Sequence, residues 1–116
     1  MKIKFLGMPF ASKVLAFAAP SQAGIYDSVI SDYLTRTADA AVRSRVQGVG
    51  VTRVGQKQLD AYQKWCEFCQ SEAKILNEHG LTWIDWNGQS CNWRAVDVER
   101  AHFVIASVRS VDLPDG

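Results

Sequence analysis

This sequence of 116 residues has few cysteines and prolines, a small net charge and only short apolar runs. Its three cysteines, an odd number, exclude a disulfide-stapled scaffold and are typical of a reducing compartment. The apolar stretch Val14–Ala19 is far shorter than the roughly 20 residues that a membrane span requires. Lys13 and Pro20 also interrupt the pattern of a signal peptide, so we expect a cytoplasmic protein that does not cross a membrane.

The sequence does contain enough apolar residues for one folded domain. Apolar residues make up 47% of the chain and charged residues 22%, with a formal net charge of +1. This composition excludes intrinsic disorder, because the chain can bury enough apolar surface to offset the entropy lost on ordering. We therefore expect a single domain over residues 1–116.

The near-zero net charge conceals two oppositely charged halves. Residues 1–58 carry eight basic and three acidic side chains, whereas residues 59–116 carry five basic and nine acidic ones. The first half therefore has a net charge of +5 and the second half −4. A basic region is the minimum electrostatic requirement for binding phosphates. Many proteins without nucleic-acid partners, however, show a similar separation of charge between their two halves.

The N-terminal half predicts helices and a connecting loop. Residues 10–18 contain good helix formers and predict a short buried helix that ends before Pro20. Asp27 is a suitable N-cap for a second helix, which we expect to continue through Val42. We interpret residues 1–43 as hairpin and Asp-bearing helices and residues 44–54 as a loop, with a short strand pair as the alternative for that loop.

Residues 55–116 carry the clearest periodic signal. A long amphipathic helix is predicted over residues 56–79, with Gly80 just beyond its end. A tryptophan-rich loop with an Asn-Gly turn follows, and a final helix over residues 93–107 completes an all-α fold. The buried stripe of the long helix is expected to consist of Leu59, Tyr62, Cys66, Cys69, Ala73 and Leu76, widened by Trp65, Phe68 and Ile75.

Three kinds of side chain could suggest a ligand site in this second half. Cys66 and Cys69, with His79 and Cys91, have a spacing compatible with zinc, but the first two lie in the apolar stripe. We therefore interpret them as core residues and expect no metal and no cofactor. The four tryptophans are interpreted mainly as core, with base stacking as the alternative, and His102 as structural or exposed.

The chemistry-bearing residues lie in the first thirty positions. A turn containing Gly7 opens the first helix, and its free backbone N–H groups could receive a phosphate. Asp27 follows an apolar run, and its carboxylate is expected to lie at the N-terminus of the next helix. A carboxylate there is suited to stabilise a developing cation or to orient a water molecule.

These segments resemble the helix-hairpin-helix DNA glycosylase superfamily, in particular the 8-oxoguanine DNA glycosylase-like proteins of bacteria. The resemblance rests on Gly7-Met8, on residues 10–17, on residues 25–30 and, more weakly, on residues 93–103. About half of the chain is covered. The motif is a hairpin helix followed by an Asp with apolar neighbours that opens the next helix.

The resemblance implies an all-helical DNA-repair enzyme that binds double-stranded DNA. Its hairpin would contact the backbone through Gly7, Met8, Phe10, Ser12 and Lys13. A damaged base, such as 8-oxoguanine, would be flipped out and its N-glycosidic bond cleaved by hydrolysis. The residue matching Asp27 would stabilise the oxocarbenium-like sugar, and in members with lyase activity a lysine attacks C1′. Lys13 is the candidate for that lysine.

The sequence also departs from the pattern of the superfamily. Pro9 stands where the second hairpin glycine is usual, and Ala11 stands where the lyase lysine is usual. Lys13, two residues further on, is turned by about 200° around the helix. The hairpin begins at the sixth residue, so the chain resembles the C-terminal half of the enzyme fold. It is then a piece that lacks the N-terminal lobe, a natural minimal form, or a remnant completed by a partner chain or a second copy.

Two non-enzymatic alternatives remain open. The first is a helix-hairpin-helix module that binds the DNA backbone without a complete base-binding site. The second is a helical protein-interaction domain that uses the tryptophan-rich half of the chain. Binding and base-release assays distinguish these functions.

Overall fold

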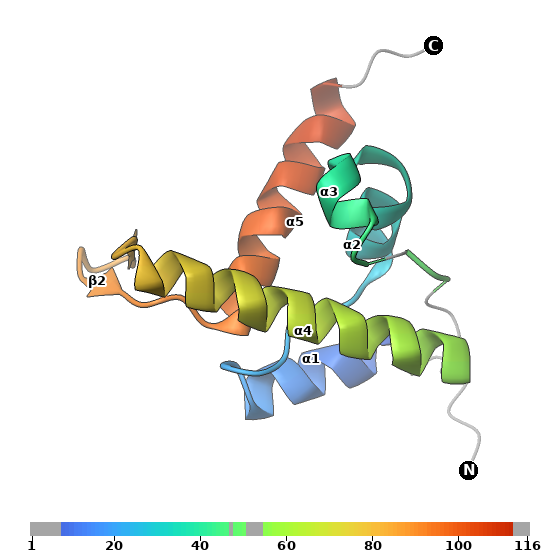
Figure 1. Cartoon of the computed structure of the whole chain (residues 1–116), viewed down its shortest axis with the longest axis horizontal. Coiled ribbons are helices and arrows are strands. Elements are labelled where there is room, and N and C mark those ends of the chain that lie inside the picture. Colours follow the sequence, from blue (N-terminus) through green and yellow to red (C-terminus); the bar gives the residue numbers. More distant parts are fainter. Residues whose placement is uncertain (1–7, 47, 51–54, 113–116) are drawn as a thin grey trace.

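The computed structural model describes residues 8–46, 48–50 and 55–112 (Figure 1). Helices form most of it, together with one small antiparallel hairpin, so the predicted all-α class is confirmed. In chain order the elements are α1 (Met8–Ala18), α2 (Ser28–Asp32), the π-helical turn η1 (Tyr33–Thr37), α3 (Ala40–Arg43), α4 (Gln56–Glu78), β1 (Trp83–Ile84), β2 (Ser90–Cys91) and α5 (Ala95–Asp112).

The long helix α4 packs mainly against α5, which crosses behind it in Figure 1. The predicted helix over residues 56–79 is confirmed, and Gly80 adopts the left-handed conformation (φ +70°) just beyond the C-cap residue His79. The inner face of α4 buries Gln58, Ala61, Tyr62, Trp65, Cys66, Phe68, Cys69 and Ala73. Leu59 and Ile75 were expected in this stripe but are exposed, because they lie at its edges where no neighbouring element covers them.

Helix α1 differs from the expected buried helix. Its inner face consists of the small residues Ser12 and Ala16, one helical turn apart, whereas Val14, Leu15 and Phe17 are exposed. Small side chains let the helix approach the segment that follows it closely. The prediction of a short buried helix was therefore correct in position, but wrong in burial, since only one narrow face of α1 is covered.

The predicted continuous helix from residue 28 to Val42 is interrupted. Asp27 does cap α2 as expected, but the chain widens into η1 and then breaks at Ala38, whose ψ of 149° is extended. α3 begins only at Ala40. The break places Ala38 in the core, and that burial outweighs the modest helix propensity of the segment.

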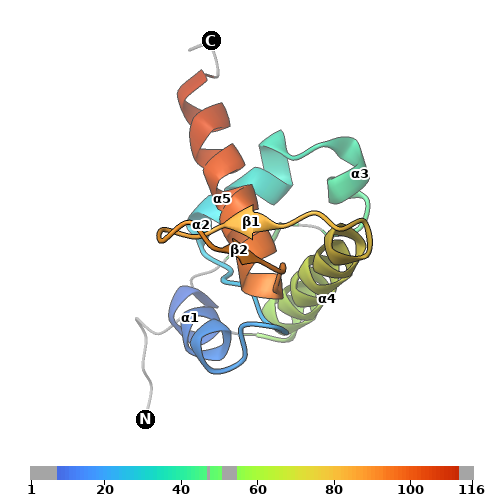
Figure 2. The ribbon, with the colours of Figure 1, turned by 90° about the vertical axis from the view of Figure 1, so that its left-hand side faces the viewer.

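A β-hairpin lies in the region expected to be an irregular tryptophan-rich loop. Trp83 pairs with Cys91 and Ile84 with Ser90, in front of α5 in Figure 2. The Asn-Gly turn was predicted correctly, since Gly88 has a φ of +84°. In the expected loop over residues 44–54, the described residues form no strand, and Gln47 and residues 51–54 lie outside the described part.

The core forms where α2, η1, α4 and α5 meet. Tyr26, Ile30 and Trp65 are fully buried there, with Leu34 and Val98 almost as well covered. The final helix was expected over residues 93–107 and is observed as α5. No helix in the described part of the chain is long and apolar enough to cross a membrane.

Candidate functional site

The segment that leads to Asp27 belongs to no helix or strand, and buried side chains form hydrogen bonds with its backbone. We call residues 24–26 the anchored segment. From α4, the Tyr62 hydroxyl donates to the Gly24 carbonyl (2.9 Å) and Trp65 Nε1–H donates to the Ile25 carbonyl (3.0 Å). Backbone groups outside helices and strands need other hydrogen-bond partners, and here two buried side chains supply them and fix this segment.

Helix α1 holds the other end of the anchored segment. The Tyr26 N–H donates to Ser12 Oγ (2.8 Å), and the Ser12 hydroxyl lies within hydrogen-bond distance of the Tyr26 carbonyl (3.2 Å) and the Pro9 carbonyl (3.3 Å). Ser12 is completely buried. This serine therefore substitutes for the backbone partner that Tyr26 lacks, and its hydroxyl is unavailable to a phosphate.

The third anchor comes from α5. The Ile25 N–H donates to Glu99 Oε1 (3.4 Å), and Glu99 Oε2 lies 3.4 Å from Arg100 Nη1. A Cβ atom at Gly24 would lie only 2.9 Å from the Glu99 Cβ and 3.4 Å from Trp65 Nε1. Any side chain at position 24 would therefore push α5 away from the anchored segment.

The Glu99 carboxyl is an ionisable group in the protein interior, with none of its side-chain surface exposed. Burial raises the pKa of Glu99 to about 7, and the Arg100 guanidinium only partly opposes this. The negative charge of Asp27 raises it further. The Glu99 carboxyl, which accepts the Ile25 N–H of the anchored segment, thus changes its charge near neutral pH.

Asp27 follows the anchored segment and lies at the N-terminus of α2. Its Oδ1 accepts the Ile30 N–H (3.0 Å), and the side chain is half-buried. The structure thus confirms the predicted N-cap. A carboxylate whose preceding backbone is fixed by three helices is preorganised, as a group that must meet a substrate at a defined position needs to be.

Lys13 lies on the exposed side of α1 and lines a surface hollow of about 400 Å³, which we call the α1 hollow. Arg94, at the start of α5, lines the same hollow and is held in place by two bonds to Asp97 (2.9 and 3.0 Å). The apolar part of the wall comes from Ala16, Phe17, Pro20, Ile25 and Val96. Two cations over an apolar floor suit a phosphate next to a sugar or base.

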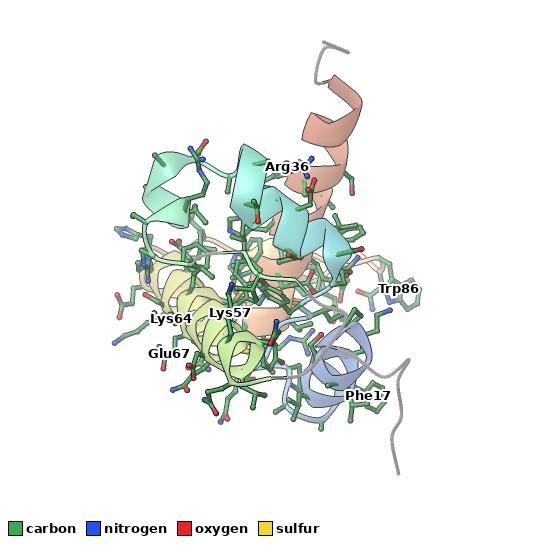
Figure 3. The ribbon with its side chains drawn as sticks, turned by 90° about the vertical axis from the view of Figure 1, so that its right-hand side faces the viewer. Phe17, Arg36, Lys57, Lys64, Glu67 and Trp86 are labelled. Carbon is green, nitrogen blue, oxygen red and sulfur yellow. The ribbon has the colours of Figure 1, made fainter. Side chains whose placement is uncertain are left out.

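Phe17 stands out in the α1 hollow because its side chain is 93% exposed. Trp86, at the tip of the β-hairpin, is 95% exposed, and Figure 3 shows both aromatic side chains on the same side of the molecule. Asp85 Oδ1 accepts the N–H groups of Asn87 and Gln89, which stiffens the hairpin tip. These aromatic side chains are available to a planar or apolar partner.

The structure brings the predicted site residues together only in part. Ile25 lines the α1 hollow with Lys13, and Asp27 comes two residues after Ile25. Within the described residues no hydrogen bond or ion pair joins Lys13 to Asp27. Among the predicted DNA contacts, Gly7 and the side chains of Met8 and Phe10 lie outside the described part.

Cys66 and Cys69 are core residues, as their positions in the apolar stripe of α4 predicted. Cys66 and Cys69 are free and buried, and burial raises the pKa of both thiols, so they pack as small apolar side chains. No group of potential metal ligands occurs among the described residues. His102 is structural, since its Nδ1 lies 2.8 Å from the Tyr33 hydroxyl and its ring contacts Trp65 and Phe68.

Sequence reasoning missed the side chains that position Asp27. Glu99 did give a signal, because it shares the inner face of α5 with Ala95, Val98 and Ala106, and an acidic residue in an apolar stripe is unusual. Ser12 gave no signal for this role, because its partner Tyr26 lies 14 residues away in the chain.

The Ser12 contact predicts a measurable loss of stability. In Ser12→Ala, the buried Tyr26 N–H loses its acceptor, so we expect the free energy of unfolding to fall by about 1–2 kcal/mol. Urea denaturation monitored by tryptophan fluorescence measures this loss. The exposed Ser44→Ala, which also removes a hydroxyl bonded to a backbone carbonyl, should change stability by less than about 0.5 kcal/mol. Equal effects would mean that Ser12 does not anchor Tyr26.

The arrangement as a whole offers a fixed carboxylate, a hollow with two cations that is lined by Ile25, two residues before that carboxylate, and exposed aromatic side chains. Such a set can hold an anionic, partly apolar ligand and stabilise positive charge that develops on it. Comparison of the chain with family models, with curated proteins and with solved structures found no match, so its function has to be inferred from this site.

Proposed function

We propose that this domain binds double-stranded DNA and releases a damaged base, such as 8-oxoguanine, as a DNA N-glycosylase of base-excision repair. The observation that carries the proposal is the anchoring of residues 24–26 by α1, α4 and α5, which fixes the backbone ahead of Asp27, while Ile25 of that segment lines the α1 hollow. The sequence resemblance assigns the catalytic carboxylate to the same residue. We place this activity in the cytoplasm.

In this mechanism Asp27 stabilises the sugar cation that forms as the N-glycosidic bond breaks, and it orients the water that attacks C1′. A flipped nucleotide would bring its sugar to the carboxylate and its flanking phosphates to Lys13 and Arg94. We assign Lys13 a phosphate contact first, because it shares its hollow with a second cation. Attack by its amine on C1′ is the lyase alternative.

The DNA-binding part of the proposal predicts a specific salt dependence. Lys13→Gln should weaken binding to duplex DNA and lower the slope of log Kd against log salt by about 0.9, the value for one lost phosphate contact. Fluorescence anisotropy over a NaCl series measures the slope. Lys74→Gln is the control, because that exposed lysine lies on α4 and pairs with Glu78. An unchanged slope in Lys13→Gln would remove Lys13 from the interface.

The second candidate function is binding to another protein, and the exposed side chains of Phe17 and Trp86 favour it. Apolar exposure on this scale commonly marks a surface that another chain covers, including a second copy of the same chain. Duplex binding without base release supports a non-enzymatic DNA-binding module. The absence of duplex binding at low salt would reject both DNA functions and leave protein interaction.

A further inference from the structure

A second group of cations lies along α4, apart from the site around Asp27. Two adjoining surface hollows of about 530 and 480 Å³ share Arg45 and Lys64 as walls, and we call them together the α4 hollow. Figure 3 shows Lys57 and Lys64 on α4, away from Phe17. The larger hollow is lined by Ser44, Arg45, Lys57, Asp60, Ala61 and Lys64, among others.

The spacing of the two lysines places their side chains on one helical face. Lys57 and Lys64 are seven residues apart, which is two turns and about 10 Å along the axis, and Ala61 lies between them. Neither lysine forms an ion pair within the described ranges. Ala61, whose side chain is small and largely buried, lines the larger hollow with both lysines.

Arg45 enters the hollow from the segment after α3 and is held from two sides. Its guanidinium lies 4.8 Å from the centre of the Phe68 ring, and its Nη1 lies 3.5 Å from Glu72 Oε1. Its side chain is still about half exposed. A guanidinium fixed by an aromatic face loses little entropy when it binds an anion.

Two carboxylates also line the hollow, and both are engaged by neighbours on the same helix. Asp60 Oδ1 accepts a hydrogen bond from Gln56 Nε2 (2.8 Å), and Glu67 Oε1 accepts one from Gln63 Nε2 (3.1 Å). These glutamines hold the carboxylates along the surface of α4. With Glu72, which pairs with Arg45, three carboxylates balance the three cations, so anion binding depends on Lys57 and Lys64, for which no ion pair occurs among the described residues.

We propose that the α4 hollow is a phosphate-binding site, in which Lys57 and Lys64 contact the phosphate oxygens and Arg45 forms the fixed wall. Lysines act as mobile point charges and the fixed guanidinium supplies planar donors, a combination that suits phosphate. The phosphate could belong to a phosphorylated small molecule or to a nucleic-acid strand. This site does not depend on Asp27 or on base release.

The first test uses inorganic pyrophosphate at constant ionic strength and follows the backbone amides by NMR. Wild-type protein should show concentration-dependent shifts at Ala61, Lys64 and Arg45. The double variant Lys57→Gln/Lys64→Gln should weaken this binding by about fivefold to thirtyfold. Lys74→Gln, which removes an exposed lysine outside the hollow, should bind like the wild type, and the same spectra report whether each variant is folded.

Two results would overturn the phosphate site. One is a pyrophosphate titration in which these amides do not shift. The other is an affinity that the double variant leaves unchanged or that Lys74→Gln lowers equally, since either outcome shows that the lysines of the hollow bind no phosphate specifically.

The second test identifies the source of the phosphate with a twelve-residue oligothymidine strand and a NaCl series. If the phosphate comes from a strand, the double variant should lower the slope of log Kd against log salt by about 1.4, the value for two contacts to single-stranded DNA. If pyrophosphate binding is lost in the double variant while this slope stays the same, the phosphate comes from a small molecule. Failure of base release leaves both readouts unaffected, so the two proposals are tested separately.

Discussion

Replacing Asp27 with asparagine should reduce base release from a lesion-bearing duplex by at least about a hundredfold, with little change in DNA affinity. The asparagine amide has no negative charge to stabilise a developing sugar cation. It also cannot accept a proton from the attacking water, as a carboxylate can. Asparagine is, however, as good an N-cap as aspartate. Its side-chain oxygen can still accept the Ile30 N–H that Asp27 Oδ1 accepts now. The substitution therefore removes the negative charge of Asp27 and keeps the hydrogen bond that caps α2.

Single-turnover cleavage of duplexes containing 8-oxoguanine, followed by strand scission at the abasic site, measures this effect. Asp32→Asn is the matched control, because Asp32 is an exposed carboxylate at the end of α2 that pairs only with Arg36 in the described ion pairs. Thermal unfolding should be the same in both variants to within about 0.5 kcal/mol. Turnover by Asp27→Asn at the wild-type rate would exclude Asp27 from the mechanism. A wild-type protein that binds duplexes but releases no base would exclude the enzyme.

Local signals in the sequence predicted the features that depend on neighbouring residues. The three- and four-residue spacing of apolar side chains predicted α4, and Gly80 and the Asn-Gly turn adopt the positive φ angles expected of them. Asp27 was predicted as an N-cap because that role depends on the next three residues alone. These short-range rules work because the interacting groups are within one helical turn.

The remaining features depend on contacts between distant parts of the chain. Ser12 and Glu99 contact the anchored segment across 14 and 74 residues, so no local pattern predicts these partners, although the place of Glu99 in an apolar stripe marks it as unusual. The outward orientation of α1 follows from the same contact, because burying Ser12 turns Phe17 towards solvent. The break at Ala38 likewise reflects the core that Ala38 enters, which outweighs local helix propensity.

Glu99→Gln should remove a pH dependence of stability that the wild-type protein shows between about pH 4.5 and pH 7. Burial raises the pKa of Glu99 from 4.5 to about 7, so between these two values the folded state binds a proton that the unfolded state has released. The contribution of Glu99 is fully present below the unfolded pKa of 4.5 and is lost as the pH rises through 7. A shift of this size corresponds to about 3 kcal/mol.

Urea denaturation of both proteins at several pH values between 5 and 8.5 tests this expectation. The two proteins should be about equally stable at pH 5, and Glu99→Gln should be the more stable by up to about 3 kcal/mol at pH 8.5. The difference between the two proteins cancels the contribution of all groups that they share. Glu78→Gln, at an exposed glutamate that pairs with Lys74, should follow the wild-type curve. A wild-type pH dependence retained by Glu99→Gln would show that Glu99 is not its source.

The same variant tests why an ionisable residue occupies this interior position. A glutamine side chain keeps the oxygen that accepts the Ile25 N–H and loses only the charge. If the role of Glu99 is to hold the anchored segment, base release should survive in Glu99→Gln and fall in Glu99→Ala, which removes the acceptor and leaves a cavity. If base release is lost equally in both variants, the charge behind Asp27 is what matters, and Glu99 acts through electrostatics rather than through the anchored segment.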